Sequence, residues 1–157
     1  ILVDISQQRL FLLDNGGTLI VSYPISSSYF GEGQVENSFK TPLGKHVIKQ
    51  KIGSDASKNI IFKERINTGR YAEIHHTDYD SDEDHVTSRI LWLEGLEEGF
   101  NKGGNVDSFN RYIYIHGTPE EGLIGKKASH GCIRMFNHDV IELYDLVQEG
   151  TKVNIVL

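Results

Sequence analysis

Short β-type segments, rather than alternating strands and helices, dominate this chain of 157 residues. Residues 9–14 and 18–25 are apolar and favourable for strands, and the Asn-Gly-Gly sequence between them tolerates positive φ. These two segments therefore predict a β-hairpin. Further short strands are expected at residues 46–52, 60–63, 89–93, 111–116 and 151–157. Because no β-α-β alternation appears, the pattern argues against a Rossmann-type parallel sheet.

One segment near the carboxyl end carries a clear helical pattern. Six apolar residues there follow a period of 3.6, namely Val140, Ile141, Leu143, Tyr144, Leu146 and Val147. We expect Asn137 to cap the helix, Asp139 to lie in its first turn and Gly150 to end it. The expected fold class is mainly β with one α-helix, and residues 1–157 are long enough for one domain.

Charge and hydropathy exclude several classes of partner. The formal net charge of −6 argues against nucleic acid, which requires a basic surface, and against an anionic membrane surface. No apolar run approaches the length of a membrane span. The chain shows no signal-peptide pattern and does not begin with Met, so the sequence leaves open whether a leader was removed.

An acidic run places aspartates at alternate positions, Asp78, Asp80, Asp82 and Asp84. An EF-hand calcium loop needs Gly at its sixth position and Glu at its twelfth, but counting from Asp78 these are Glu83 and Arg89. We therefore expect a solvated loop rather than a calcium site.

The only cysteine, Cys132, lies in the sequence Ser-His-Gly-Cys-Ile-Arg-Met at 129–135, and His116 lies sixteen residues upstream. A lone cysteine is often a small buried hydrophobe. Here Ser129 and Gly131 favour a turn, and the flanking His130 and Arg134 are polar, which argues against burial. A free thiol beside a histidine is typical of a nucleophile and its base.

His116 ends a predicted strand, and the glycine-rich loop after it can bring the cysteine back to that strand end. The imidazole would take the thiol proton, leaving a thiolate–imidazolium pair, and backbone amides near Gly131 and Cys132 would stabilise an oxyanion. This chemistry is acyl transfer through a thioester. Two alternatives stay open: a zinc site formed by His116, His130 and Cys132, and a binding module without catalysis.

These motifs resemble the YkuD family, the L,D-transpeptidases of bacterial cell walls. The resemblance rests on Ile-His-Gly-Thr at 115–118, on the cysteine motif at 129–135 and on Thr-Pro-Leu-Gly at 41–44, and it extends from the first strand to the last. It implies a β-sandwich-like catalytic domain without a cofactor. It also implies Cys132 as nucleophile, His116 as base and the carbonyl of Gly117 as the group that orients the imidazole.

The resemblance assigns further roles around the cysteine. His130 would shape the site, Ser129 would brace the turn, and Arg134 would bind a substrate carboxylate, with a structural ion pair as the alternative role of Arg134. Lys127 replaces a proline that many relatives have, so the loop should be less stiff. Together with Lys126 it would favour substrates with free carboxylates.

By resemblance, the donor is a peptidoglycan stem tetrapeptide, cut between the L-centre of a diamino acid and the terminal D-alanine. Transfer of the acyl group to an amine would make the protein a transpeptidase. Transfer to water would make it an L,D-carboxypeptidase acting in muropeptide recycling. The expected partners are stem peptides or muropeptides, and the expected state is a monomer. The expected location is the periplasm or cell envelope, or the cytoplasm if no leader was removed.

Overall fold

The computed structural model describes all residues from 1 to 157 and contains ten strands, one α-helix and two 3-10 helices. The strands are β1 (Leu2–Asp4), β2 (Arg9–Leu13), β3 (Leu19–Pro24), β4 (Gly44–Ile52), β5 (Ile60–Lys63), β6 (Ile66–Tyr71), β7 (Val86–Gly95), β8 (Tyr114–Gly117), β9 (Ile133–Met135) and β10 (Lys152–Val156). The helices are η1 (Gly104–Val106), η2 (Glu121–Leu123) and α1 (Asn137–Leu146). The expected mainly β class with one α-helix is confirmed.

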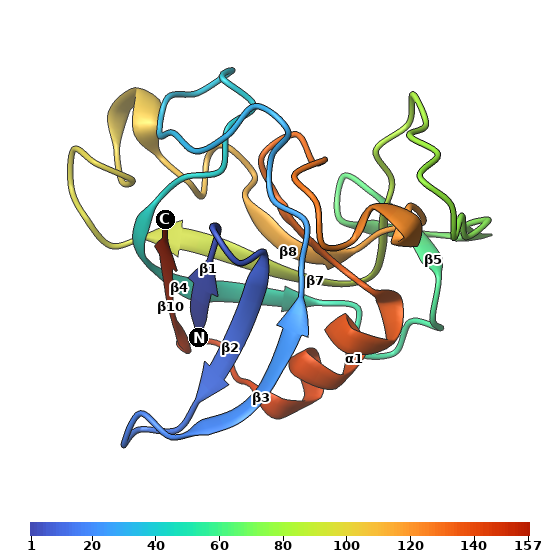
Figure 1. Ribbon diagram of the computed structural model, residues 1–157, viewed down its shortest axis with the longest axis horizontal. Coiled ribbons are helices and arrows are strands. Elements are labelled where there is room, and N and C mark those ends of the chain that lie inside the picture. Colours follow the sequence, from blue (N-terminus) through green and yellow to red (C-terminus); the bar gives the residue numbers. More distant parts are fainter.

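All ten strands belong to one hydrogen-bonded sheet that branches at β7 (Figure 1). The main path runs β3-β2-β1-β10-β4-β7-β5-β6, while β8 pairs with β7 and β9 pairs with β8. Only the pairs β1–β10 and β8–β9 are parallel. Because β7 carries β4, β5 and β8 along its ten residues, the strands that bear the histidine and the cysteine motif are anchored to the centre of the sheet.

The two arms of the sheet and α1 enclose one main core of 19 buried residues. In Figure 1, β2 and β3 cross β4 and β7 at a steep angle, and residues from both arms, such as Leu10 and Leu91, belong to this core. Ile115 of β8 and Ile133 of β9 also belong to it. Successive side chains of a strand point to opposite faces, so the neighbours of these isoleucines point away from the main core.

The hairpin predicted for residues 9–25 is confirmed by β2 and β3, and the strand predicted at 60–63 is β5. The helix prediction needs two corrections. The helix ends at Leu146, before Gly150. Asn137 is the first helical residue rather than the cap, and its amide donates to the Glu121 carboxylate at 2.9 Å. The buried Asn137 side chain instead forms hydrogen bonds with β7 and with the segment after β8.

None of the helices is long and apolar enough to cross a membrane. The longest, α1, has ten residues and a length of about 15 Å, roughly half the thickness of a hydrocarbon core.

Candidate active site

The parallel pair β8–β9 sets the register of the candidate site. His116 of β8 lies opposite Arg134 of β9, and Cys132 directly precedes β9. Since side chains alternate along a strand, Cys132 and Arg134 share a face, and Tyr114 and His116 share the same face on the neighbouring strand. The histidine and the cysteine therefore project from adjacent strands to one side, away from the main core.

The Cys132 thiol is partly exposed and lies beside the beginning of β8. Its sulfur accepts a hydrogen bond from the Tyr114 amide at 3.3 Å and donates one to the Tyr112 carbonyl at 3.3 Å. No hydrogen bond joins the sulfur to His116. Burial raises the pKa of Cys132 to about 12, although the Tyr114 amide opposes this shift. The resting thiol is therefore protonated at neutral pH.

His116 is buried and held in one orientation by the backbone. Its Nδ1 lies 2.5 Å from the carbonyl oxygen of Gly117, so Nδ1 carries the proton and Nε2 keeps a free lone pair. Burial lowers the pKa of His116, and the nearby Asp84 carboxylate opposes this shift. Burial thus favours the neutral forms of both groups in the resting protein, whereas the sequence predicts a thiolate–imidazolium pair once the imidazole reaches the sulfur.

Gly117 fits its position only because it lacks a side chain. A Cβ atom there would lie 2.5 Å from the side-chain oxygen of Asn137 and 2.6 Å from the carbonyl oxygen of Thr87. Any larger residue would move the carbonyl that orients His116.

The cysteine loop is braced by its own serine. The Ser129 hydroxyl donates to the Cys132 carbonyl at 2.6 Å and accepts from the Gly131 amide at 3.2 Å. Gly131 has φ of +127°, a conformation that favours glycine. The Gly131 amide is thus occupied by Ser129. This corrects the expectation that it would be a free oxyanion donor, and it leaves Gly131 the role of a turn residue.

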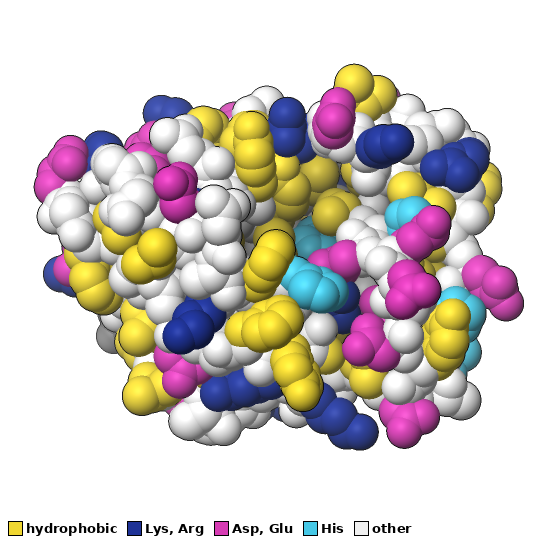
Figure 2. Space-filling model, turned by 90° about the horizontal axis from the view of Figure 1, so that it is seen from above, with side chains coloured by type: hydrophobic (Ala, Val, Ile, Leu, Met, Phe, Trp, Pro, Cys, Tyr) yellow, Lys and Arg dark blue, Asp and Glu magenta, His cyan; other side chains and the backbone are white.

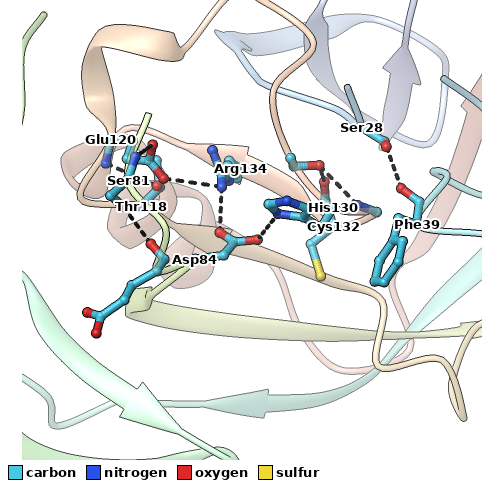
Figure 3. A network of polar contacts seen from close by, with 12 residues as sticks. Ser28, Phe39, Ser81, Asp84, Thr118, Glu120, His130, Cys132 and Arg134 are labelled. Carbon is cyan, nitrogen blue, oxygen red and sulfur yellow. Dashed lines mark hydrogen bonds and ion pairs between the residues drawn. The ribbon is translucent and has the colours of Figure 1, made fainter. Parts of the chain in front are cut away.

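The Thr-Pro-Leu-Gly segment at 41–44 holds the same loop from outside. The buried Thr41 hydroxyl donates to the Gly131 carbonyl at 3.0 Å and accepts from the Ser28 amide at 3.0 Å. The Ser28 hydroxyl in turn donates to the Phe39 carbonyl (Figure 3). In the sequence, only the resemblance to the family pointed to this segment. In the structure, Thr41 joins it to the cysteine loop.

Arg134 is completely buried and paired with carboxylates (Figure 3). Its Nη2 lies 2.5 Å from Asp84 and 3.4 Å from Glu120. Burial tends to raise the pKa of Asp84, but the Arg134 guanidinium and the hydrogen bond with His130 outweigh it, and the net pKa is lowered. With no exposed guanidinium, the geometry favours the ion-pair alternative over direct binding of a substrate carboxylate.

Asp84 also corrects the interpretation of the acidic run. Asp78, Asp80 and Asp82 are exposed, as expected for a solvated loop. The side chain of Asp84 is only 29% exposed and forms ion pairs with both Arg134 and His130. No sequence spacing points to this contact, because a loop far upstream supplies the carboxylate.

His130 lies at the mouth of the site. Its Nδ1 is 3.0 Å from Asp84, and its ring centroid lies 6.1 Å from that of Phe30 and 6.2 Å from that of Phe39. His130 and Cys132 both line a surface cavity of about 320 Å³. No three His, Cys, Asp or Glu side chains converge as metal ligands would, so the zinc alternative lacks a ligand set. Figure 2 shows hydrophobic side chains and a histidine around a hollow on this face.

The fold and the site define a mainly β domain with a free cysteine in a surface cavity and a buried histidine on the adjacent strand. The family model of YkuD, the L,D-transpeptidase catalytic domain, matches residues 1–155. The chain belongs to this family.

Curated relatives carry the same family name. A protein named "Putative L,D-transpeptidase YkuD" from Bacillus subtilis (strain 168) is 58% identical over 60 residues, which is 35% of this chain and 37% of that protein. A "Probable L,D-transpeptidase YcfS" from Escherichia coli (strain K12) is 25% identical over 159 residues, 99% of this chain and 43% of that protein. The matches thus span less than half the length of these relatives.

Solved structures confirm the fold. L,D-transpeptidase 3 from Mycobacterium tuberculosis, in complex with a faropenem-derived adduct, aligns with a TM-score of 0.59 at 17% identity. The alignment covers 99% of this chain and 59% of that one. An L,D-transpeptidase from Enterococcus faecium aligns with a TM-score of 0.57 at 18% identity, covering 99% of this chain and 48% of that one.

Proposed function

We propose that this chain is the catalytic domain of an L,D-transpeptidase that uses Cys132 as its nucleophile and His116 as its base. The donor would be a peptidoglycan stem tetrapeptide, cut between the L-centre of its diamino acid and the terminal D-alanine. The observation that carries this proposal is that Cys132 and the buried His116 lie on one face of adjacent strands, and that Cys132 lines an open cavity. Membership of the family supplies the substrate class.

The first half of the reaction acylates the enzyme. Rotation about the Cα–Cβ bond of Cys132 turns the sulfur from the Tyr112 carbonyl toward Nε2 of His116. As the sulfur attacks the scissile carbonyl, the thiol proton passes to Nε2, and the Gly117 carbonyl stabilises the imidazolium through Nδ1–H. Because the resting pair is neutral, charge develops only when substrate is present.

Collapse of the tetrahedral intermediate completes the acylation. The carbon–nitrogen bond breaks, the imidazolium of His116 returns a proton to the departing amine of D-alanine, and a thioester to Cys132 remains. An amine from a second stem peptide then gives its proton to His116 and attacks the thioester. A new amide forms and the thiol is regenerated. Such a substrate implies work in the periplasm or cell envelope.

A product assay tests the proposal. The protein is incubated with a disaccharide tetrapeptide, with and without an acceptor stem, and the products are read by mass spectrometry. A crosslinked dimer is expected. Tripeptide alone would replace the transpeptidase with the L,D-carboxypeptidase, in which water takes the place of the amine, and no D-alanine release at all would contradict both.

Two substitutions test the assigned roles in the same assay. Cys132→Ala should abolish turnover and keep the fold, because the thiol supports no large part of the core. His116→Gln should lower turnover by about 10²- to 10⁴-fold, the usual contribution of a general base. The matched control is His76→Ala, an exposed histidine that should keep normal turnover. Equal losses in the two histidine variants would remove the base assignment.

A further inference from the structure

A second arginine, Arg111, lies in the cavity that holds Cys132. It is only partly buried, and no carboxylate of the protein lies within 4.0 Å of its guanidinium. Arg134, by contrast, is fully buried between Asp84 and Glu120. Of these two arginines beside the cysteine motif, only Arg111 offers a molecule in the cavity a positive charge that has no ion-pair partner.

Backbone carbonyls fix the guanidinium of Arg111 in place. Nη1 donates to the carbonyls of Gly33 and Gln34 at 3.4 and 3.2 Å, and Nη2 donates to that of Lys40 at 2.7 Å. The Lys40 carbonyl also lies against the cysteine loop, 3.4 Å from where a Cβ of Gly131 would be. The guanidinium is thus one carbonyl group away from the residue that precedes Cys132.

The position of Arg111 along the chain matters for a substrate. Arg111 begins the segment that leads into β8, His116 lies near the end of β8, and the Cys132 sulfur contacts residues 112 and 114 between them. A peptide attacked by the sulfur would therefore have the base on one side and the guanidinium on the other.

Resting on the proposed function, we infer that Arg111 binds the C-terminal carboxylate of the donor peptide, the carboxylate of the departing D-alanine. That carboxylate belongs to the residue directly after the scissile bond, within about 3.8 Å of it along the chain. Guanidinium groups bind carboxylates through charge-assisted hydrogen bonds. The site would therefore prefer peptides that end one residue after the cleaved bond.

The other charged groups around the cavity fit this assignment. Glu36 lies on the cavity wall without an ion-pair partner and opposes the binding of an anion. His130 faces the cavity but is engaged by Asp84. Lys127 pairs with Glu32 at 3.2 Å and does not line the cavity. The preference for carboxylates that the sequence assigned to Lys126 and Lys127 is thus better placed on Arg111.

Alkylation of the thiol tests the carboxylate site without any peptide substrate. Iodoacetate and iodoacetamide react with the same thiolate, so the ratio of their rates at one pH cancels the ionised fraction of Cys132 and reports the attraction of the carboxylate. Arg111→Met should lower the iodoacetate-to-iodoacetamide ratio by about tenfold, the usual effect of losing a charged hydrogen bond. Lys127→Met, which removes a neighbouring charge outside the cavity, should leave the ratio unchanged. An unchanged ratio in Arg111→Met, or an equal fall in both variants, would overturn the assignment.

Arg111→Met also removes three hydrogen bonds to residues 33–40 and could disturb the loop. Glu36→Gln gives an independent result, because the Glu36 side chain makes no hydrogen bond that the substitution would break. Loss of its negative charge should strengthen the attraction of Arg111 for a carboxylate in the cavity. We expect the ratio to rise by about threefold in this variant. A ratio that stays the same or falls would contradict the role of Arg111 even if Arg111→Met does not fold.

A second comparison uses peptide substrates. Wild-type protein should cleave a tetrapeptide with a free carboxylate at a kcat/KM about tenfold or more above its C-terminal amide, and Arg111→Met should lose this preference by slowing only the acid. Equal rates for acid and amide in the wild type would overturn the inference. If neither peptide is cleaved, the proposed function fails, while the alkylation ratios still decide whether Arg111 binds carboxylates.

Discussion

At the scale of single residues, burial controls the protonation of both members of the candidate catalytic pair. It raises the pKa of Cys132 and lowers that of His116, so neither is charged in the resting protein. An ion pair at this position would leave two desolvated charges without full hydrogen bonding. In the proposed mechanism, the neutral pair avoids that cost until a substrate carbonyl is in reach.

The raised pKa of Cys132 gives a pH prediction. With a pKa of about 12, the thiolate fraction should increase about tenfold for each pH unit through the neutral and mildly alkaline range. The alkylation rate by iodoacetamide should rise in the same way, as followed by intact-mass spectrometry. A plateau that is reached near neutral pH would instead indicate a preformed thiolate–imidazolium pair.

Asp84 supplies a charge that the buried Arg134 needs. Asp84→Asn should lower the free energy of unfolding by about 3 kcal/mol, because it leaves a desolvated guanidinium with only the more distant Glu120. Since the pKa of Asp84 is lowered in the fold, this stabilisation is present above the unfolded pKa and disappears as the pH falls through the folded value. Urea denaturation measures both effects. Asp82→Asn, in the same loop and exposed, should change stability by less than about 0.5 kcal/mol, and equal effects would contradict the ion-pair role.

The sequence located the cysteine and histidine of this site because their chemistry is carried by short local motifs. It did not locate Asp84, nor did it show that Arg111 would lack an ion-pair partner, because both depend on how distant loops fold around the motif. For Arg134 the sequence allowed two roles, and only its burial separates them.

At the scale of elements, the sequence predicted the strands with a strong local pattern of apolar and turn residues, but not those with a weak one. The hairpin of β2 and β3 was predictable because apolar segments flank an Asn-Gly-Gly turn. The strand β6 is mostly exposed and polar, and β9 has only three residues with a buried arginine in the middle. β6 lacks apolar alternation, and the alternation of β9 covers only three residues, which is too short to indicate a strand. Their pairing partners, β5 and β8, define them instead.

The strand β4 carries a buried histidine that makes stability depend on pH. His46 is fully buried, with Nδ1 2.9 Å from the Gly44 carbonyl and Nε2 2.8 Å from the Ser108 hydroxyl. Burial lowers its pKa from 6.5 to about 4. In this pH range the unfolded chain therefore binds a proton at His46, whereas the folded protein does not. The free energy of unfolding should fall by roughly 3 kcal/mol as the pH falls from the unfolded to the folded pKa of His46.

Thermal unfolding across this pH range, with His46→Gln as the comparison, measures the contribution of His46. The variant cannot take up the proton and should show a flatter dependence on pH. The exposed His138 provides the control, because His138→Gln should keep the wild-type slope. A wild-type slope in His46→Gln would show that other groups cause the loss of stability.

At the scale of the whole molecule, the buried side chain of Asn137 joins the sheet, the helix and the candidate site. Its oxygen accepts hydrogen bonds from the hydroxyls of Thr87 and Ser88 on β7, both at 2.6 Å. Its nitrogen donates to the Thr118 carbonyl after β8 at 2.8 Å. The same side chain packs directly behind Gly117, so the branch of the sheet and the orientation of His116 share one anchor.

Asn137→Ala should therefore affect stability and activity together. It leaves several buried polar groups without partners, and we expect a loss of about 3 kcal/mol, or a fall in Tm of about 10 °C for a chain of this size. Turnover should also fall, because the Gly117 carbonyl gains room to move and orients His116 less well. The control is Asn154→Ala on the exposed face of β10, which should change neither quantity. Loss of stability with unchanged kcat in folded Asn137→Ala would show that the anchor supports the fold alone. In that case the backbone of β8 would suffice to hold the imidazole in place.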